Sequence, residues 1–168
     1  MPSPRVSTEL NSGTYFITFT VKKWYYLFDR HDRWNIIADA LSYCRIHKAL
    51  KLYGFVFMLN HIHLIVSSPD TAGFVRDFKK HTSKEMRKNI VATEGNIEKL
   101  FVDSDGTYSL WKETNMPVFL ETEKVFLQKL NYIQENPVRK NYVMKAEDWY
   151  WSSSNRECEL KADDVNDR

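Results

Sequence analysis

Two histidines separated by one residue could bind a metal ion together. His61 and His63 open the second of two strands predicted over residues 53–59 and 61–66, which meet at a polar break. Alternate side chains of a strand point to the same face, so both imidazoles should lie on one face and Ile62 on the other. Imidazole nitrogens bind divalent metals at about 2.0–2.1 Å. A half-exposed strand can carry two histidines without a metal, so the spacing alone leaves both interpretations open.

A tyrosine on a predicted helix could supply a nucleophile. In the helix expected over residues 122–135, the apolar stripe that faces the sheet consists of Phe126, Leu127, Leu130 and Ile133. Tyr132 lies at the rim of this stripe, and Asn136 follows one turn later on the same ridge. Its hydroxyl can therefore lie beside the Asn136 amide. Taken alone, the position is better explained by a core tyrosine with a hydrogen-bonded hydroxyl.

A second predicted helix is strongly basic. It begins near Thr71 and runs past Asn89, with a buried stripe made of Phe74, Phe78, Thr82 and Met86. Only two acidic residues oppose its cationic groups, which are Arg76, Lys79, Lys80, His81, Lys84, Arg87 and Lys88. A solvated helix face is the ordinary explanation of such a charge run. Binding of phosphates by Lys79, Lys80, Lys84 and Arg87 is the functional one.

Composition narrows the possible classes of protein. A chain of 168 residues with 43% hydrophobic and 27% charged residues is predicted to form one soluble domain. A net charge of +2 gives no overall basic excess, so nucleic-acid binding would depend on a local patch. Two cysteines are too few for a disulfide scaffold, and no stretch has the length of a membrane helix or the character of a signal peptide. We therefore expect a reduced, cytoplasmic protein.

The expected elements follow one another as strand, helix, two strands, helix, strand and helix. Outside the ranges already given, these are a strand at 15–21, a helix at 32–50 capped by Asp32, and strand pieces at 110–111 and 116–120. Pro117 marks an edge strand, and residues 91–108 are expected to form a loop. The order predicts an α+β, ferredoxin-like β-α-β-β-α-β fold, with an extra C-terminal helix that carries Tyr132 and stops before Pro137. Residues 14–153 should form the domain, between a flexible leader (1–13) and a frayed, charged tail (154–168).

The motifs taken together resemble the single-tyrosine HUH transposases, and most closely the branch of the REP-associated tyrosine transposases. The resemblance is carried by residues 60–64 (NHIHL), 78–84 (FKKHTSK), Trp111 and 132–139 (YIQENPVR). It spans nearly the whole chain, and the motifs are specific because they occur in this order. It implies a ferredoxin-like fold that binds single-stranded DNA, often folded in hairpins.

The resemblance also implies site residues. His61 and His63 match the metal-binding pair, Asn136 the polar side chain that completes the metal site, and Tyr132 the nucleophile. Arg139 closes the matched motif and is counted with the DNA-binding cations. Two positions depart from many relatives: Gln134 stands where they carry histidine, and Asn141 where they carry glycine. Asparagine tolerates the left-handed conformation, so the turn after the helix should survive.

The implied activity is that of a metal-dependent single-stranded DNA endonuclease and strand transferase. Two histidines and an amide leave room on Mg²⁺ or Mn²⁺ for phosphate oxygen and water. Attack by the tyrosine would leave a 5′-phosphotyrosine and a free 3′-OH, and needs no nucleotide cofactor. Two alternatives stay open: an inactive or host-adapted DNA-hairpin binding protein, and a phosphodiesterase that uses water. The partner is single-stranded DNA with hairpin structure and not a membrane, and a homodimer is possible.

Overall fold

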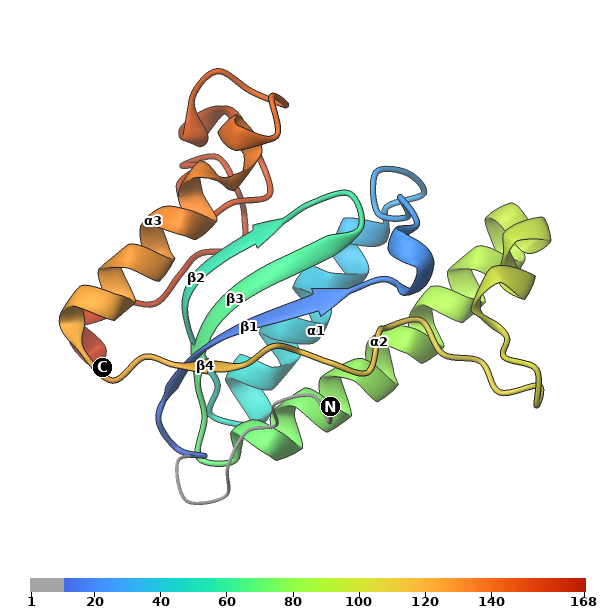
Figure 1. The fold of residues 1–168 in the computed structure, drawn as a ribbon, viewed down its shortest axis with the longest axis horizontal. Coiled ribbons are helices and arrows are strands. Elements are labelled where there is room, and N and C mark those ends of the chain that lie inside the picture. Colours follow the sequence, from blue (N-terminus) through green and yellow to red (C-terminus); the bar gives the residue numbers. More distant parts are fainter. Residues whose placement is uncertain (1–10) are drawn as a thin grey trace.

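A computed structural model describes residues 11–168 as one antiparallel sheet with helices on both faces (Figure 1). The main elements are β1 (Thr14–Thr20), α1 (Arg33–His47), β2 (Lys51–Phe57), β3 (His61–Ser67), α2 (Thr71–Glu94), β4 (Val118–Phe119) and α3 (Glu123–Arg139). The strand order β2-β3-β1-β4 confirms the ferredoxin-like prediction, with β4 as an edge strand directly after Pro117. The predicted flexible leader lies largely outside the described residues.

Strand alternation divides the sheet into two different faces. On β1, Ile17 and Phe19 point into the larger core, which α1 and α2 cover. The next side chain to each points the other way, and Phe16 joins a smaller core with Phe126 and Ile133 of α3. The sheet therefore separates α1 and α2 from α3 (Figure 1).

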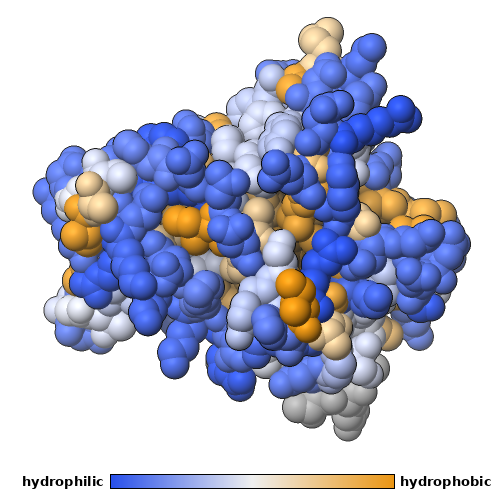
Figure 2. Space-filling model, turned by 180° about the vertical axis from the view of Figure 1, so that it is seen from behind, coloured by the Kyte–Doolittle hydropathy of each residue, from blue (hydrophilic) through white to orange (hydrophobic). Residues whose placement is uncertain are grey.

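Helices α1 and α2 turn a mostly hydrophilic surface to solvent, as Figure 2 shows from behind. The predicted stripe of α2 is buried as expected, at Phe74, Phe78, Thr82 and Met86. Asp32 does precede α1, but its side chain makes no capping hydrogen bond and its φ is 58°. The loop predicted at 91–108 is partly wrong: α2 continues to Glu94 and a 3₁₀ segment follows at Gly95–Phe101. Burial of Ile97 and Phe101 stabilises that segment despite its polar neighbours.

The end of α3 differs from the prediction. The helix does not stop before Pro137 but includes it and ends at Arg139. Pro137 lies in the last turn and is buried, so packing offsets the one helical hydrogen bond that proline cannot donate. Asn141 follows in the left-handed conformation with φ 60°, as expected from its residue type. The amides of Asn141 and Tyr142 donate to the carbonyls of Val138 and Pro137, which closes a Schellman cap.

Helix α3 packs closely on β2. Phe126 and Ile133 are fully buried there, whereas Leu127, predicted to share their stripe, is 50% exposed. Each helical residue advances about 100°, so Leu127 lies too far around the helix from Phe126 to reach the sheet. A Cβ atom on Gly54 would lie 2.8 Å from Leu130 Cδ1, so the absence of a side chain at Gly54 gives Leu130 its place.

The C-terminal residues are not frayed. Cys158 and Leu160 are buried in the larger core. Asp163 accepts a hydrogen bond from the Leu52 amide at 2.8 Å through its carboxylate, and its own amide donates to the Leu52 carbonyl at 2.7 Å. Strand β2 is at the edge of the sheet, where its backbone groups need partners. The prediction of a frayed tail rested on its charged residues, most of which are exposed, and missed the burial of Cys158 and Leu160 between them.

Replacing Phe126 with alanine should test how α3 is held. The buried ring leaves a cavity, so we expect the free energy of unfolding to fall by about 3–5 kcal/mol. The neighbouring change Leu127→Ala should alter it by no more than about 0.5 kcal/mol, because that side chain is half exposed. Urea unfolding of both variants measures the difference. Equal losses would contradict the packing described here.

Candidate active site

His61 and His63 lie on the face of the sheet that α3 covers. Their ring centroids are 4.8 Å apart, and β1 supports them from the neighbouring register positions, Thr20 and Thr18. Thr18 Oγ1 is 2.8 Å from His63 Nδ1. His63 is 6% exposed, and Phe16 stacks on it with a centroid distance of 5.2 Å. The alternation predicted from the sequence thus places both imidazoles side by side.

Asn60 determines which nitrogen of His61 is free. Its Nδ2 donates to the Trp24 carbonyl at 3.0 Å, which turns its Oδ1 to His61 Nδ1 at 2.7 Å. An amide oxygen only accepts, so Nδ1 carries the proton and Nε2 keeps its lone pair. A second hydrogen bond of this kind orients metal-binding histidines in proteins.

Both histidines are uncharged near neutral pH. Burial lowers the pKa of His61 to about 4, with a further contribution from Lys140. Burial lowers the pKa of His63 to about 3, with contributions from His61, Lys129 and Arg139. A neutral imidazole is the form that binds a metal, so no proton has to be displaced at pH 7.

Tyr132 lies next to the histidines, at the rim of α3. Its ring centroid is 5.5 Å from that of His63 and 5.9 Å from that of Phe16, and the residue is 38% exposed. The Arg139 guanidinium lies 4.5 Å from the ring centroid, and its Nη2 donates to the Tyr132 carbonyl at 2.6 Å. Lys129 Nζ lies 5.6 Å from the same centroid. The tyrosine is thus accessible and flanked by cations, as a group that meets a phosphate should be.

Asn136 follows Tyr132 by one helical turn and is 5% exposed. Its Oδ1 is buried and accepts no hydrogen bond from any of the residues that the structure describes. Such an oxygen costs about 1–3 kcal/mol and calls for a partner such as a bound ion. Among residues 11–168, no group of three or more His, Cys, Asp or Glu could hold a metal. Together, the two imidazole nitrogens and the Asn136 amide oxygen would make an uncharged donor set, whose chemistry suits Mg²⁺ or Mn²⁺ that also binds phosphate.

The predicted DNA-binding cations of α2 are not near this site. Helix α2 covers the opposite face of the sheet. Lys79 donates to the carbonyls of Lys112 and Glu113 at 2.8 and 3.2 Å, and burial lowers its pKa. Arg87 pairs with Glu98 at 2.7 Å.

Lys80 and Lys84 are exposed and form no ion pair within residues 11–168. The site instead has Arg139, which was predicted, together with Lys129 and Lys140, which were not. Lys129 stands three residues before Tyr132, so helical spacing contained the signal for it.

Comparison with solved structures supports the fold. A REP-associated tyrosine transposase, solved bound to a REP hairpin, superposes with a TM-score of 0.71 and 18% identity over 98% of this chain and 93% of that one. This chain has the fold of a REP-associated tyrosine transposase. The resemblance drawn from the motifs is thus confirmed for the fold.

Other comparisons add little. A candidate transposase from Deinococcus radiodurans aligns over 80% of this chain and 97% of that one, with 14% identity and a TM-score of 0.43, too low for an argument. No protein-family model and no curated protein sequence matches the chain. Within residues 11–168, none of the helices combines the length and apolar character needed to cross a bilayer.

The buried histidines should make stability depend on pH. Below 6.5 the unfolded chain protonates them, whereas the folded protein resists protonation until about pH 4 for His61 and about pH 3 for His63. The unfolded state then binds more protons, so the free energy of unfolding of the metal-free protein should fall as the pH drops from 6.5. Each histidine contributes up to about 1.4 kcal/mol per pH unit.

Urea unfolding between pH 7 and 5 measures this slope. His63→Gln should make it shallower, and His47→Gln, at an exposed position on α1, should leave it unchanged. An unaltered slope in the His63 variant would show that the imidazole is not buried as described.

Proposed function

We propose that the protein cuts and rejoins hairpin-containing single-stranded DNA, with Tyr132 as the nucleophile. The observation that supports this most is the position of Tyr132: its ring centroid is 5.5 Å from that of His63, on the sheet face where His61 also lies. Tyr132 and both histidines lie together within one chain, which supports a site formed by a single protomer. The transposase fold, shared with a protein solved on a DNA hairpin, is in keeping with this.

The residues around the site suit a phosphodiester substrate. Lys129, Arg139 and Lys140 surround the imidazoles with positive charge, which attracts and orients the scissile phosphate. The Tyr132 oxygen then bonds to phosphorus, the bond from phosphorus to the 3′ oxygen breaks, and the tyrosine proton passes to water. The released 3′ oxygen takes up a proton and becomes the 3′-OH. Because the phosphotyrosine keeps a phosphodiester bond, a second 3′-OH can reverse the reaction and join another strand.

The donor atoms for a divalent ion would be the nitrogens of His61 and His63 and the Asn136 amide oxygen. Bound there, Mg²⁺ or Mn²⁺ would neutralise phosphate charge as a Lewis acid. Imidazole ligation favours Mn²⁺, whereas magnesium prefers oxygen-rich sites. Thr18 and Asn60 hold the two rings in position from behind.

Tyr132→Phe tests the nucleophile. The change removes one oxygen and keeps the ring between Phe16 and Arg139, so the free energy of unfolding should change by no more than about 1 kcal/mol. Hairpin binding should persist, while cleavage and the protein–DNA adduct disappear on a denaturing gel with Mn²⁺ or Mg²⁺. Tyr150→Phe is a matched control, because Tyr150 is 40% exposed and Tyr132 38%. Cleavage by the Tyr132 variant at a comparable rate would assign the attack to water or another tyrosine.

Thr18→Val tests the metal site without removing a ligand. The variant keeps the shape of the side chain but loses the 2.8 Å contact with His63 Nδ1. We expect the affinity for Mn²⁺, measured by titration calorimetry, to fall by about 10- to 100-fold. Thr20→Val is the control on the same strand face, since Thr20 lies opposite His61 and its hydroxyl has no hydrogen bond to another side chain in the described residues. If both variants bind Mn²⁺ as the unmodified protein does, His63 is not a ligand.

A further inference from the structure

Two large aromatic side chains are exposed where the chain leaves β1. Trp24 is 59% and Tyr26 56% exposed, although tryptophan and tyrosine usually bury most of their surface. They line an open hollow of about 620 Å³ together with Lys23, Tyr25, Arg30 and Asn60. We call Trp24 and Tyr26 the aromatic rim. It stands apart from the tyrosine and histidines of the candidate active site.

Asn60 connects the aromatic rim to that site. Its Nδ2 donates to the Trp24 carbonyl at 3.0 Å, while its Oδ1 lies 2.7 Å from His61 Nδ1. One side chain therefore separates the backbone of the rim from a candidate metal ligand. A strand held at His61 would therefore lie one side chain away from the backbone that carries Trp24.

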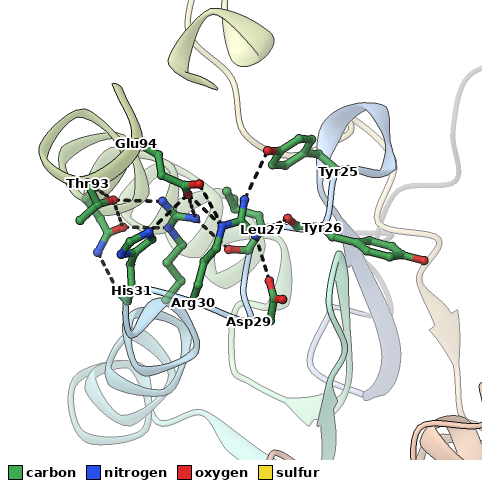
Figure 3. Close-up of polar contacts among 10 residues, drawn as sticks. Tyr25, Tyr26, Leu27, Asp29, Arg30, His31, Thr93 and Glu94 are labelled. Atoms are coloured by element: carbon green, nitrogen blue, oxygen red, sulfur yellow. Dashed lines mark hydrogen bonds and ion pairs between the residues drawn. The ribbon is translucent and has the colours of Figure 1, made fainter. Parts of the chain in front are cut away.

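The backbone that carries the rim is held by hydrogen bonds and ion pairs on its inner side. Arg30 donates to the Tyr26 carbonyl at 2.8 Å and to the Tyr25 hydroxyl at 3.3 Å, and also pairs with Glu94 at 3.0 Å (Figure 3). The fully buried Arg33 pairs with Glu94 at 2.7 Å. Figure 3 shows the Tyr26 ring pointing away from this network. The backbone of the segment is thus held on its inner side while the Trp24 and Tyr26 side chains stay exposed, which lowers the entropy that ordering a ligand there would cost.

The backbone conformation is unusual as well. Lys23 and Trp24 have φ values of 61° and 56°, where side chains other than glycine are strained. An exposed tryptophan gains little free energy from burial, so its burial does not offset that strain. The position is better explained by something that the ring contacts than by folding alone.

Cations surround the rim. Lys112 Nζ lies 3.6 Å from the centroid of the Trp24 ring. Trp24 is still 59% exposed, so the face of the indole away from Lys112 is open. Lys23 is exposed, and neither lysine forms an ion pair within residues 11–168. Tyr26 also interacts with Tyr142, which stacks on Trp149 at a centroid distance of 5.5 Å. Proteins bind single-stranded nucleic acids with exposed aromatic rings, on which the bases stack, and with cations that contact the phosphates.

We infer that the aromatic rim stacks the unpaired bases of the DNA strand next to the scissile phosphate, while Lys23 and Lys112 hold its phosphates. This inference rests on the proposed function, since it assigns a subsite to the same substrate. The ligand is a single strand because a duplex keeps its base faces stacked on one another and offers none to Trp24. A hairpin stem must therefore bind elsewhere on the protein.

Fluorescence anisotropy with chelator present tests the rim without cleavage. The probes are a short labelled oligothymidine, a blunt hairpin, and the same hairpin with a single-stranded extension. Trp24→Ala should weaken binding of the oligothymidine and the extended hairpin by about five- to hundredfold, and leave the blunt hairpin unchanged. Trp24→Phe, which retains an aromatic face, should recover most of the affinity. Tyr43→Ala, at a 57% exposed aromatic on α1, should have no effect.

Tyr26→Leu keeps bulk without an aromatic face and provides a second test, should Trp24→Ala disturb folding. Single-strand affinity equal to the unmodified protein in both variants, or an equal loss on the blunt hairpin, would overturn the inference. Absence of single-strand binding by the unmodified protein would also overturn it. Formation of the Tyr132 adduct is scored separately: adduct without dependence on Trp24 refutes the rim alone, and dependence on Trp24 without adduct refutes the proposed chemistry alone.

Discussion

The seating of α3 on the sheet is the contact on which the candidate site depends. Tyr132 is on α3 and the histidines are on β3, about seventy residues earlier, so packing alone brings them together. Leu130 lies where Gly54 has no side chain, and Phe126 and Ile133 fill the small core on either side of it. A shift of α3 by one residue would rotate Tyr132 by about 100° and take it away from His63.

The last residues of the chain add to that seating. The Arg168 guanidinium lies 3.7 Å from the centroid of the Phe126 ring and pairs with Glu123, so it covers the start of α3. The Asp163 carboxylate, in the same C-terminal segment, accepts a hydrogen bond from the Leu52 amide of β2. Helix α3 is therefore held between the sheet and the C-terminal segment. Rigid support of this kind holds Tyr132 within a narrow range of positions, as its proposed role of nucleophile requires.

Properties that depend on local periodicity were predictable from the sequence. Strand alternation placed His61 and His63 on one face, and helical spacing placed Tyr132 at a rim beside Asn136. Long-range packing was not predictable. Burial of Cys158 and Leu160 in a polar tail, the passage of α3 through Pro137, and the position of α2 across the sheet all depend on contacts between distant segments. Charge counting therefore favoured α2, although the cations beside the histidines are Lys129, Arg139 and Lys140.

The two faces of the sheet differ in what they bury. The face under α1 and α2 buries a large apolar core and supplies most of the stability. The face under α3 buries two neutral imidazoles and the unpaired Asn136 oxygen, which cost free energy in the protein alone. Asn60 bonds to His61 and to the Trp24 backbone at once, so one side chain links the backbone of the aromatic rim to the imidazole. In the proposed function, a strand bound at the rim would help to orient the His61 ring beside the phosphate that Tyr132 attacks.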